Sequence, residues 1–312
     1  MATHQFEPTH YQVTIGSHDP VLRLADGDSV HTSTVDALGF DAQGVQVASR
    51  GNPQTGPFFV DGAEPGDTLA VRIDRLTPSR ATGISSTVLA ANVLDPDMVP
   101  LFPRETPNAE WRLDTAAGMA TLVGPDGRPT DVQLALAPML GCFGVAPALG
   151  QAISTATAGA HGGNMDYRGF GVGVTAYFPV FARGALFHLG DGHAVQGDGE
   201  ILGSGIDTSM QVAFTVHVLK GTRSAWSCGE DAEAIFTVGN ARPLDQALQH
   251  ATTEMARWLV QDLALDPAIA YPLLGMCVRY DVGNVVDPAY TVVCKMAKHV
   301  LQSRLGTTPA YR

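Results

Sequence analysis

Two polar, glycine-rich clusters in the middle of the chain hold the side chains best suited to chemistry. The first is His161-Gly-Gly-Asn-Met-Asp166, and the second is Gly190-Asp-Gly-His-Ala-Val-Gln-Gly-Asp-Gly-Glu200. Glycine at this density weakens a regular strand and lets the backbone bend or approach another group closely. Carboxylates, imidazoles and amides on such loops are suited to holding a metal ion or a small polar substrate.

The first candidates for metal ligands are Asp166, Asp191 and His193. Asp191 and His193 stand two residues apart, so on an extended segment both side chains point to one side. Asp166 ends the first cluster and is expected to close the site from another strand. Carboxylate and imidazole ligands suit zinc first, while calcium or another transition metal stays open. The alternative is a turn aspartate beside a surface histidine, which the density of the cluster disfavours.

A carboxylate beside a metal-activated water can accept a proton and return it later in a reaction. Glu200 is the candidate general base and acid. Asp198 could take that catalytic role or be a further ligand, and its alternative is an ordinary Gly-Asp-Gly turn. His161 is a third catalytic candidate, as a ligand or as a group behind the ligands, with a loop histidine as the alternative.

Three further residues are candidates for substrate binding. Asn164 and Gln196 can hydrogen-bond a polar substrate, or they can cap their own loops. Glu64, in the distant segment Val60-Asp-Gly-Ala-Glu-Pro-Gly-Asp67, would reach the same pocket from another part of the chain.

Two other functions compete with a metal-dependent hydrolase. Cys142 could be a nucleophile on a tight turn, with His161 or His193 as its base. A buried cysteine acting as a small apolar residue is the alternative. The acidic loops could also bind calcium in a non-catalytic β-sandwich that presents a ligand-binding surface.

Short strands separated by turns are expected to position these loops. Thr68–Asp74 alternates apolar and polar residues, and Ser209–Val218 does so more clearly. Many short strands with frequent turns indicate a sandwich or barrel. The pattern predicts a mainly β fold, with a sandwich or barrel-like region over residues 1–221 that carries the site.

The remaining residues, 222–312, are predicted to form a smaller α/β region with two helices. Pro243–Leu265 has apolar residues at helical spacing, and this helix should stop near Asp266-Pro267. Asp287-Pro288 looks like an N-cap followed by a proline at the first helical position. Residues 292–301 would then form the apolar stripe of a second helix.

Composition excludes several classes of partner. The chain has 312 residues, of which 45% are hydrophobic and 16% are charged, and its formal net charge is −12. Without a basic run it is not expected to bind nucleic acid or anionic lipid. We see no secretory signal and no apolar stretch of membrane-spanning length. The four cysteines lack CxxC spacing and indicate reduced thiols and a cytoplasmic location.

Long motifs in the chain closely resemble the acetamidase/formamidase family of linear-amide hydrolases. They are residues 161–166 (HGGNMD), 177–200 (YFPVFARGALFHLGDGHAVQGDGE), 203–212 (GSGIDTSMQV), 55–68 and 278–288. The resemblance spans roughly residues 10–298. It implies a mainly β fold with a small C-terminal α/β part, and hydrolysis of a short amide such as formamide or acetamide to a carboxylate and ammonia. Together with the low charge content, it also implies a homodimer.

Overall fold

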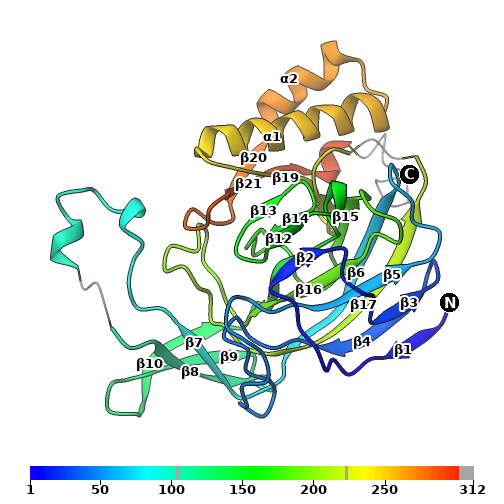
Figure 1. The fold of residues 1–312 in the computed structure, drawn as a ribbon. Coiled ribbons are helices and arrows are strands. Elements are labelled where there is room, and N and C mark those ends of the chain that lie inside the picture. Colours follow the sequence, from blue (N-terminus) through cyan, green and yellow to red (C-terminus); the bar gives the residue numbers. More distant parts are fainter. Residues whose placement is uncertain (103–105, 222–223, 302–312) are drawn as a thin grey trace.

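The computed structural model describes residues 1–102, 106–221 and 224–301 (Figure 1). Strands make up most of its regular structure, and the two α-helices lie near the C-terminal end of the sequence. The prediction of a mainly β fold is therefore confirmed. In the part of the chain described, no helix combines the length and the apolar character of a membrane-spanning segment.

The larger of two main sheets has nine strands in the order β1-β4-β17-β6-β15-β18-β19-β21-β20. In that order they are β1 (Thr3–Gln5), β4 (Ser29–Ser33), β17 (Met210–Leu219), β6 (Thr68–Pro78), β15 (Thr175–Pro179), β18 (Cys228–Glu230), β19 (Ala234–Ala241), β21 (Tyr290–Ala297) and β20 (Arg279–Val282). β1 pairs with β4 in parallel, and the other neighbours are antiparallel. The two strands predicted from alternation are β6 and β17. In β17, Met210 and Val212 are buried while Gln211 is exposed, as expected.

The second main sheet has six strands in the order β13-β14-β11-β16-β5-β3. They are β13 (Ala158–Gly159), β14 (Gly162–Asn164), β11 (Met139–Gly144), β16 (Phe187–His193), β5 (Thr55–Val60) and β3 (Leu22–Leu24). Its aromatic side chains meet those of the larger sheet. Phe214 of β17 packs edge-to-face on Phe58 of β5 and Phe187 of β16, with ring centroids 5.2 and 5.3 Å apart. The main core therefore lies between the two sheets.

The remaining strands form two smaller sheets. A four-stranded sheet extends from the body at the lower left of Figure 1, in the order β10 (Pro129–Ala135), β9 (Met119–Val123), β8 (Ala109–Asp114) and β7 (Thr82–Ser85). Short 3₁₀ helices η1 (Ala91–Val93) and η2 (Val99–Leu101) lie between β7 and β8 in the sequence, while η3 (Ala148–Gly150) and η5 (Lys298–Leu301) lie elsewhere. β2 (Thr14–Gly16) pairs with β12 (Ala152–Ser154).

Helix α1 (Leu244–Arg257) covers the outer face of β19 and β21 (Figure 1). A π-helical turn, η4 (Trp258–Asp262), ends it. The helix α2 (Pro267–Cys277) follows, and the Asp266 side chain caps it by accepting from the Ala268 N–H at 2.8 Å. The stop predicted near Asp266-Pro267 is confirmed.

The helix predicted after Asp287 is wrong, because residues 290–297 form strand β21 between β19 and β20. Val292, Val293 and Cys294 are all buried, since α1 covers one face of this strand and the main core covers the other. A strand buried on both faces has a nearly continuous apolar run, which periodicity alone does not separate from a helix. The Asp287 carboxylate accepts from the Asn164 side chain instead of capping a helix.

The division of the chain at residue 221 stays a prediction. Hydrogen bonding in the nine-stranded sheet runs across that boundary, because β15 pairs with β18 and β18 pairs with β19. The residues after 221 therefore extend the same sheet and add the two helices.

Gly239 of β19 lies directly beneath α1, and we expect Gly239→Ala to destabilise the fold. An added Cβ would sit 2.0 Å from the Ala247 carbonyl oxygen and 2.6 Å from the Ala251 nitrogen, and both are backbone atoms. Overpacking of this kind costs about 1–3 kcal/mol of unfolding free energy. Gly275→Ala in α2 is the control. It meets nothing within 4 Å and should stabilise by roughly 0.5–1 kcal/mol. Urea unfolding measures both, and equal stabilities would contradict this packing.

Candidate functional site

The two glycine-rich clusters meet at one buried site. Asp191 and His193 lie on β16, and Asp166 follows the end of β14 by two residues. All three side chains are buried. The Nε2 atom of His193 lies 3.3 Å from Asp191 Oδ1, so the two side chains meet as the i, i+2 spacing predicts.

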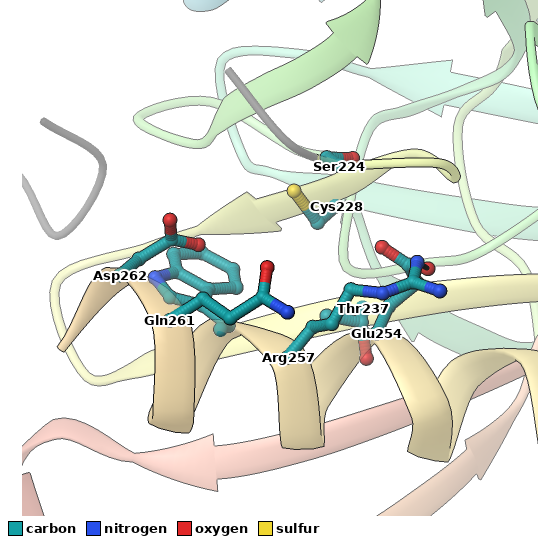
Figure 2. Close-up of a pocket in the computed structure, with 8 residues that line it drawn as sticks. Ser224, Cys228, Thr237, Glu254, Arg257, Gln261 and Asp262 are labelled. Atoms are coloured by element: carbon teal, nitrogen blue, oxygen red, sulfur yellow. Dashed lines mark hydrogen bonds and ion pairs between the residues drawn. The ribbon is translucent and has the colours of Figure 1, made fainter. Parts of the chain in front are cut away.

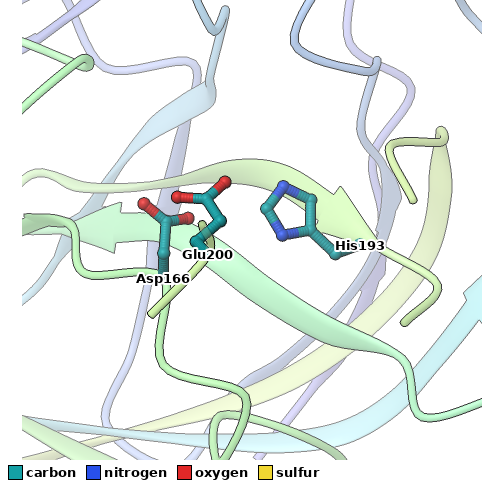
Figure 3. A group of neighbouring side chains, drawn as sticks. All are labelled: Asp166, His193 and Glu200. Carbon is teal, nitrogen blue, oxygen red and sulfur yellow. The ribbon is translucent and has the colours of Figure 1, made fainter. Parts of the chain in front are cut away.

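Glu200 reaches the same site from the loop after β16. Asp166, His193 and Glu200 each offer one ligand atom, and these three atoms lie within 4.8 Å of one another (Figure 3). The loop is held by the segment after β20, since the Gly199 N–H donates to Val282 and the Val285 N–H donates to Gly199. The segment after β14 and the β16 strand with its following loop therefore supply one oxygen-and-nitrogen group that can coordinate a cation.

Gly141 of β11 makes room for the two aspartates. It faces Asp191 across the β11–β16 pairing, because Leu140 pairs with Gly192 and Cys142 with Gly190. A Cβ added to Gly141 would lie 2.3 Å from Asp166 Oδ1 and 2.6 Å from Asp191 Oδ2. Any larger residue would displace both carboxylates.

Three of the site residues have left-handed backbone conformations. The φ angles of Asp166, Asp191 and Glu200 are +44°, +57° and +47°. Such angles are uncommon outside glycine and cost about 1–3 kcal/mol each where they are strained. Conformations of this kind gather where surrounding structure enforces a functional geometry, and here they aim three carboxylates at one point.

The site has an excess of negative charge. Four buried carboxylates belong to it (Asp166, Asp191, Glu200 and Asp207), and Asp287 is partly buried beside them. Burial raises the pKa of Asp166 and of Glu200 well above the usual range, and neighbouring carboxylates raise that of Asp166 further. Burial also raises the pKa of Asp207 to about 7 and that of Asp287 to about 6.

His193 carries the compensating charge. Burial alone would lower its pKa, but the charges of Asp191 and Asp207 outweigh burial and raise it well above the usual value. One imidazolium does not balance the surrounding carboxylates. Asp166 Oδ1 is buried and has no hydrogen-bond partner. A divalent cation would supply the missing charge and a partner for that oxygen, so the donor set fits such an ion.

Asp207, Asp287 and Asn284 also belong to the site but were not among the sequence candidates. Asp207 Oδ1 lies 3.2 Å from His193 Nε2, and the Asn284 side chain donates to Asp166 Oδ2 at 3.4 Å. Asp287 was instead assigned to a helix cap. All three lie in motifs that carry the family resemblance, at residues 203–212 and 278–288, and those motifs were the signal that could have identified them.

Asn164 contacts Asp287 of this group, and His161 stands at the start of the same glycine-rich cluster. Both polar atoms of the Asn164 side chain have a partner, because its Oδ1 accepts from Asn52 at 2.8 Å and its Nδ2 donates to Asp287 at 2.7 Å. His161 is buried, and its Nε2 has no hydrogen-bond partner. Burial lowers the pKa of His161 to about 4, so its ring is neutral at pH 7.

The structure does not bring Asp198 or Glu64 to the cluster. Asp198 is half-exposed and forms an ion pair with Arg168. Glu64 is also half-exposed and lies 3.4 Å from the Arg183 guanidinium. Both patterns are those of solvent-facing ion pairs. Asp198 is only two residues from Glu200 in sequence, but its side chain faces away from the cluster.

Cys142 lies next to the site in an environment that opposes a thiolate. Its Sγ is buried and donates to the Thr155 carbonyl oxygen at 3.6 Å. Burial raises its pKa well above the usual value, and the charges of Asp191 and Asp166 raise it further. Reactive cysteines lie in electropositive, partly exposed surroundings, which is the reverse of this arrangement.

A separate small pocket lies where α1 and η4 meet β18 and β19 (Figure 2). Two of its charged groups pair with each other, since Arg257 donates to Glu254. Glu254 also accepts from the Ala225 N–H at 3.1 Å. The pocket contains none of the predicted site residues, and Arg257 and Glu254 are already paired with each other. The buried carboxylate cluster is therefore the candidate site.

Several solved structures with a similar architecture carry the name acetamidase. The chain matches the acetamidase from Yersinia enterocolitica with 31% identity and a TM-score of 0.80, covering 96% of this chain and 93% of that one. This chain belongs to the acetamidase/formamidase family. A predicted acetamidase/formamidase from Thermoanaerobacter tengcongensis matches with 28% identity and a TM-score of 0.84, covering 97% and 98% of the two chains.

The family model for Acetamidase/Formamidase matches residues 147–296, which include every member of the cluster described above. An acetamidase from Mycolicibacterium smegmatis is 33% identical over 174 residues. That match covers 53% of this chain and 39% of the relative's length, so the chain spans well under two thirds of this curated relative.

We expect Gly141→Ala to weaken cation binding, because the added methyl group displaces Asp166 and Asp191 together. Disturbing groups that orient metal ligands typically lowers metal affinity roughly 10- to 100-fold. Gly197→Ala is the matched control, since Gly197 lies on the loop that carries Glu200 but an added Cβ there meets nothing within 4 Å. Calorimetric titration with zinc compares the two variants with the wild type. Unchanged affinity in Gly141→Ala would show that the two carboxylates do not hold the ion.

Proposed function

We propose that the protein hydrolyses a short linear amide, of the formamide or acetamide type, to a carboxylate and ammonia with the help of a bound divalent cation. The observation that carries this proposal is the buried group of Asp166, His193 and Glu200, with ligand atoms within 4.8 Å of one another. The names of the related proteins support the substrate class.

Asp166, Asp191 and His193 are the proposed cation ligands, and zinc is the first candidate. The imidazole nitrogen of His193 favours zinc or another transition metal over calcium, which prefers oxygen ligands throughout. When bound, such an ion polarises a carbonyl group and lowers the pKa of a water molecule. This donor chemistry also disfavours the non-catalytic calcium site.

Glu200 is the proposed general base and acid. Its pKa is raised by burial and by the Asp287 and Asp191 charges, although His193 opposes the shift. A carboxyl group with a raised pKa can hold a proton near neutral pH and donate it to a departing amine. The alternative role for Glu200 is a fourth ligand, and its amide variant separates the two roles.

His161 and Asn164 are the proposed groups around the substrate. The neutral His161 ring has a buried, unpartnered Nε2, which can accept a hydrogen bond from an amide N–H. Asn164 links Asn52 to Asp287 and so holds the wall of the site in place. The second N–H of its Nδ2 is the group that would contact substrate.

A homodimer and a cytoplasmic location are also part of the proposal. The family resemblance and the 16% content of charged residues support association of two copies. The four cysteines are all free thiols, in agreement with a reducing compartment. Neither point enters the chemistry of the site.

Release of ammonia from formamide and acetamide tests the proposal. We expect turnover by the wild type, its loss on chelation and its return when one divalent metal is added. Glu200→Gln should keep the metal and lose turnover by roughly 100-fold or more, the range for a missing general base. Asp198→Asn, from the same loop but on the surface, should keep turnover near the wild-type rate. Loss of the metal in Glu200→Gln would make this residue a ligand, and turnover indifferent to chelation would overturn the metal mechanism.

The thiol alternative has its own test. We expect Cys142→Ala to retain turnover, because the Cys142 thiol is buried, protonated and bonded to a carbonyl oxygen. Amide hydrolysis before and after treatment with a thiol-alkylating reagent gives the same comparison on the wild type. A folded but inactive Cys142→Ala protein would favour the cysteine mechanism.

A further inference from the structure

The side chain of Gln196 is buried and has protein partners at both ends of its amide group. Its Oε1 lies 2.8 Å from His193 Nδ1. Its Nε2 donates to the Asp166 carbonyl oxygen at 2.5 Å and to the Gly283 carbonyl oxygen at 3.4 Å. The residue therefore joins two members of the cation-binding group to the loop after β20.

These contacts fix which way the amide points. A reversed amide would place Oε1 against the carbonyl oxygens of Asp166 and Gly283, which are acceptors only. The observed orientation avoids that repulsion and leaves Oε1, an acceptor, facing His193. The Nδ1 atom of His193 must then carry a proton in order to donate to Gln196.

The other ring nitrogen of His193 faces carboxylates. Nε2 lies 3.3 Å from Asp191 Oδ1 and 3.2 Å from Asp207 Oδ1. When Nδ1 holds the single proton of a neutral ring, the lone pair on Nε2 points at these oxygens. That arrangement is repulsive until a cation lies between them. With the proton on Nε2, the ring would instead donate to the carboxylates and could not ligate.

We propose that Gln196 is a positioning residue that locks His193 in the tautomer able to bind a cation through Nε2. This inference rests on the proposed function, and it replaces the expectation that Gln196 contacts substrate, because every polar atom of its amide has a protein partner. The same side chain holds the Asp166 backbone in its left-handed conformation, so one amide group orients two cation-binding residues.

Two variants of Gln196 test the lock. Gln196→Leu has a similar size but offers no acceptor to Nδ1. Gln196→Glu keeps an acceptor oxygen facing His193, and when its carboxyl group is protonated it also keeps a donor toward the Asp166 carbonyl. Nitrogen NMR of the zinc-loaded protein identifies which ring nitrogen carries the proton and which binds the ion, with His193→Ala assigning the signal. Competition with a chelator gives the zinc dissociation constant.

In the zinc-loaded protein we expect a proton on Nδ1 in the wild type and in Gln196→Glu, and a mixture of both tautomers in Gln196→Leu. Zinc affinity should fall roughly 10- to 100-fold in Gln196→Leu, as for other groups that orient metal ligands, and should recover in Gln196→Glu. A proton on Nε2 in the wild type would overturn the lock, and so would an unchanged tautomer and zinc affinity in Gln196→Leu.

The wild-type spectrum alone decides between the two tautomers, so the test remains decisive if Gln196→Leu does not fold. Failure of the wild type to bind zinc or any other divalent metal would contradict the proposed function. Zinc binding with the His193 proton on Nε2 would leave the proposed function standing and overturn only the role of Gln196.

Discussion

Crowding of like charge in a buried space is the constraint on which the rest of this structure depends. Carboxylates from three parts of the chain converge around His193, and burial makes their mutual repulsion far stronger than it would be in water. The fold must hold them together against that repulsion. Burial and the neighbouring carboxylates raise the pKa values of Asp166, Glu200 and Asp207. A compensating cation turns the same repulsion into binding energy.

The surrounding structure supplies the rigidity that this site needs. Two sheets with interlocking aromatic rings give β11 and β16 a fixed register, and Gly141 leaves space where a methyl group would not fit. Left-handed backbone at Asp166, Asp191 and Glu200 is maintained by strands and loops that pair on either side. Strain at the site is thus balanced by packing elsewhere, as is common where function sets the geometry.

Sequence patterns predicted the elements that bury one face and expose the other, because their apolar and polar residues then recur at the spacing of a strand or a helix. β17 has one face toward the core, so its alternation was readable, and α1 has a single buried stripe. β21 is buried on both faces, so its sequence does not alternate between apolar and polar residues. Asp166, Asp191, His193 and Glu200 were identifiable because glycine and polar residues gather around them. Asp207 and Asn284 stand among ordinary strand and loop residues, and only long-range contacts place them at the site.

The sequence positions of these groups also determine when the site can form during synthesis. The loop between β20 and β21 supplies Asn284 and Asp287, although the other members lie between residues 166 and 207. A nascent chain emerges from the ribosome N-terminus first, so its glycine-rich loops are exposed long before their last partners are available. The complete cation site can therefore form only late in synthesis. Chains that are still incomplete carry the acidic loops without Asn284 and Asp287.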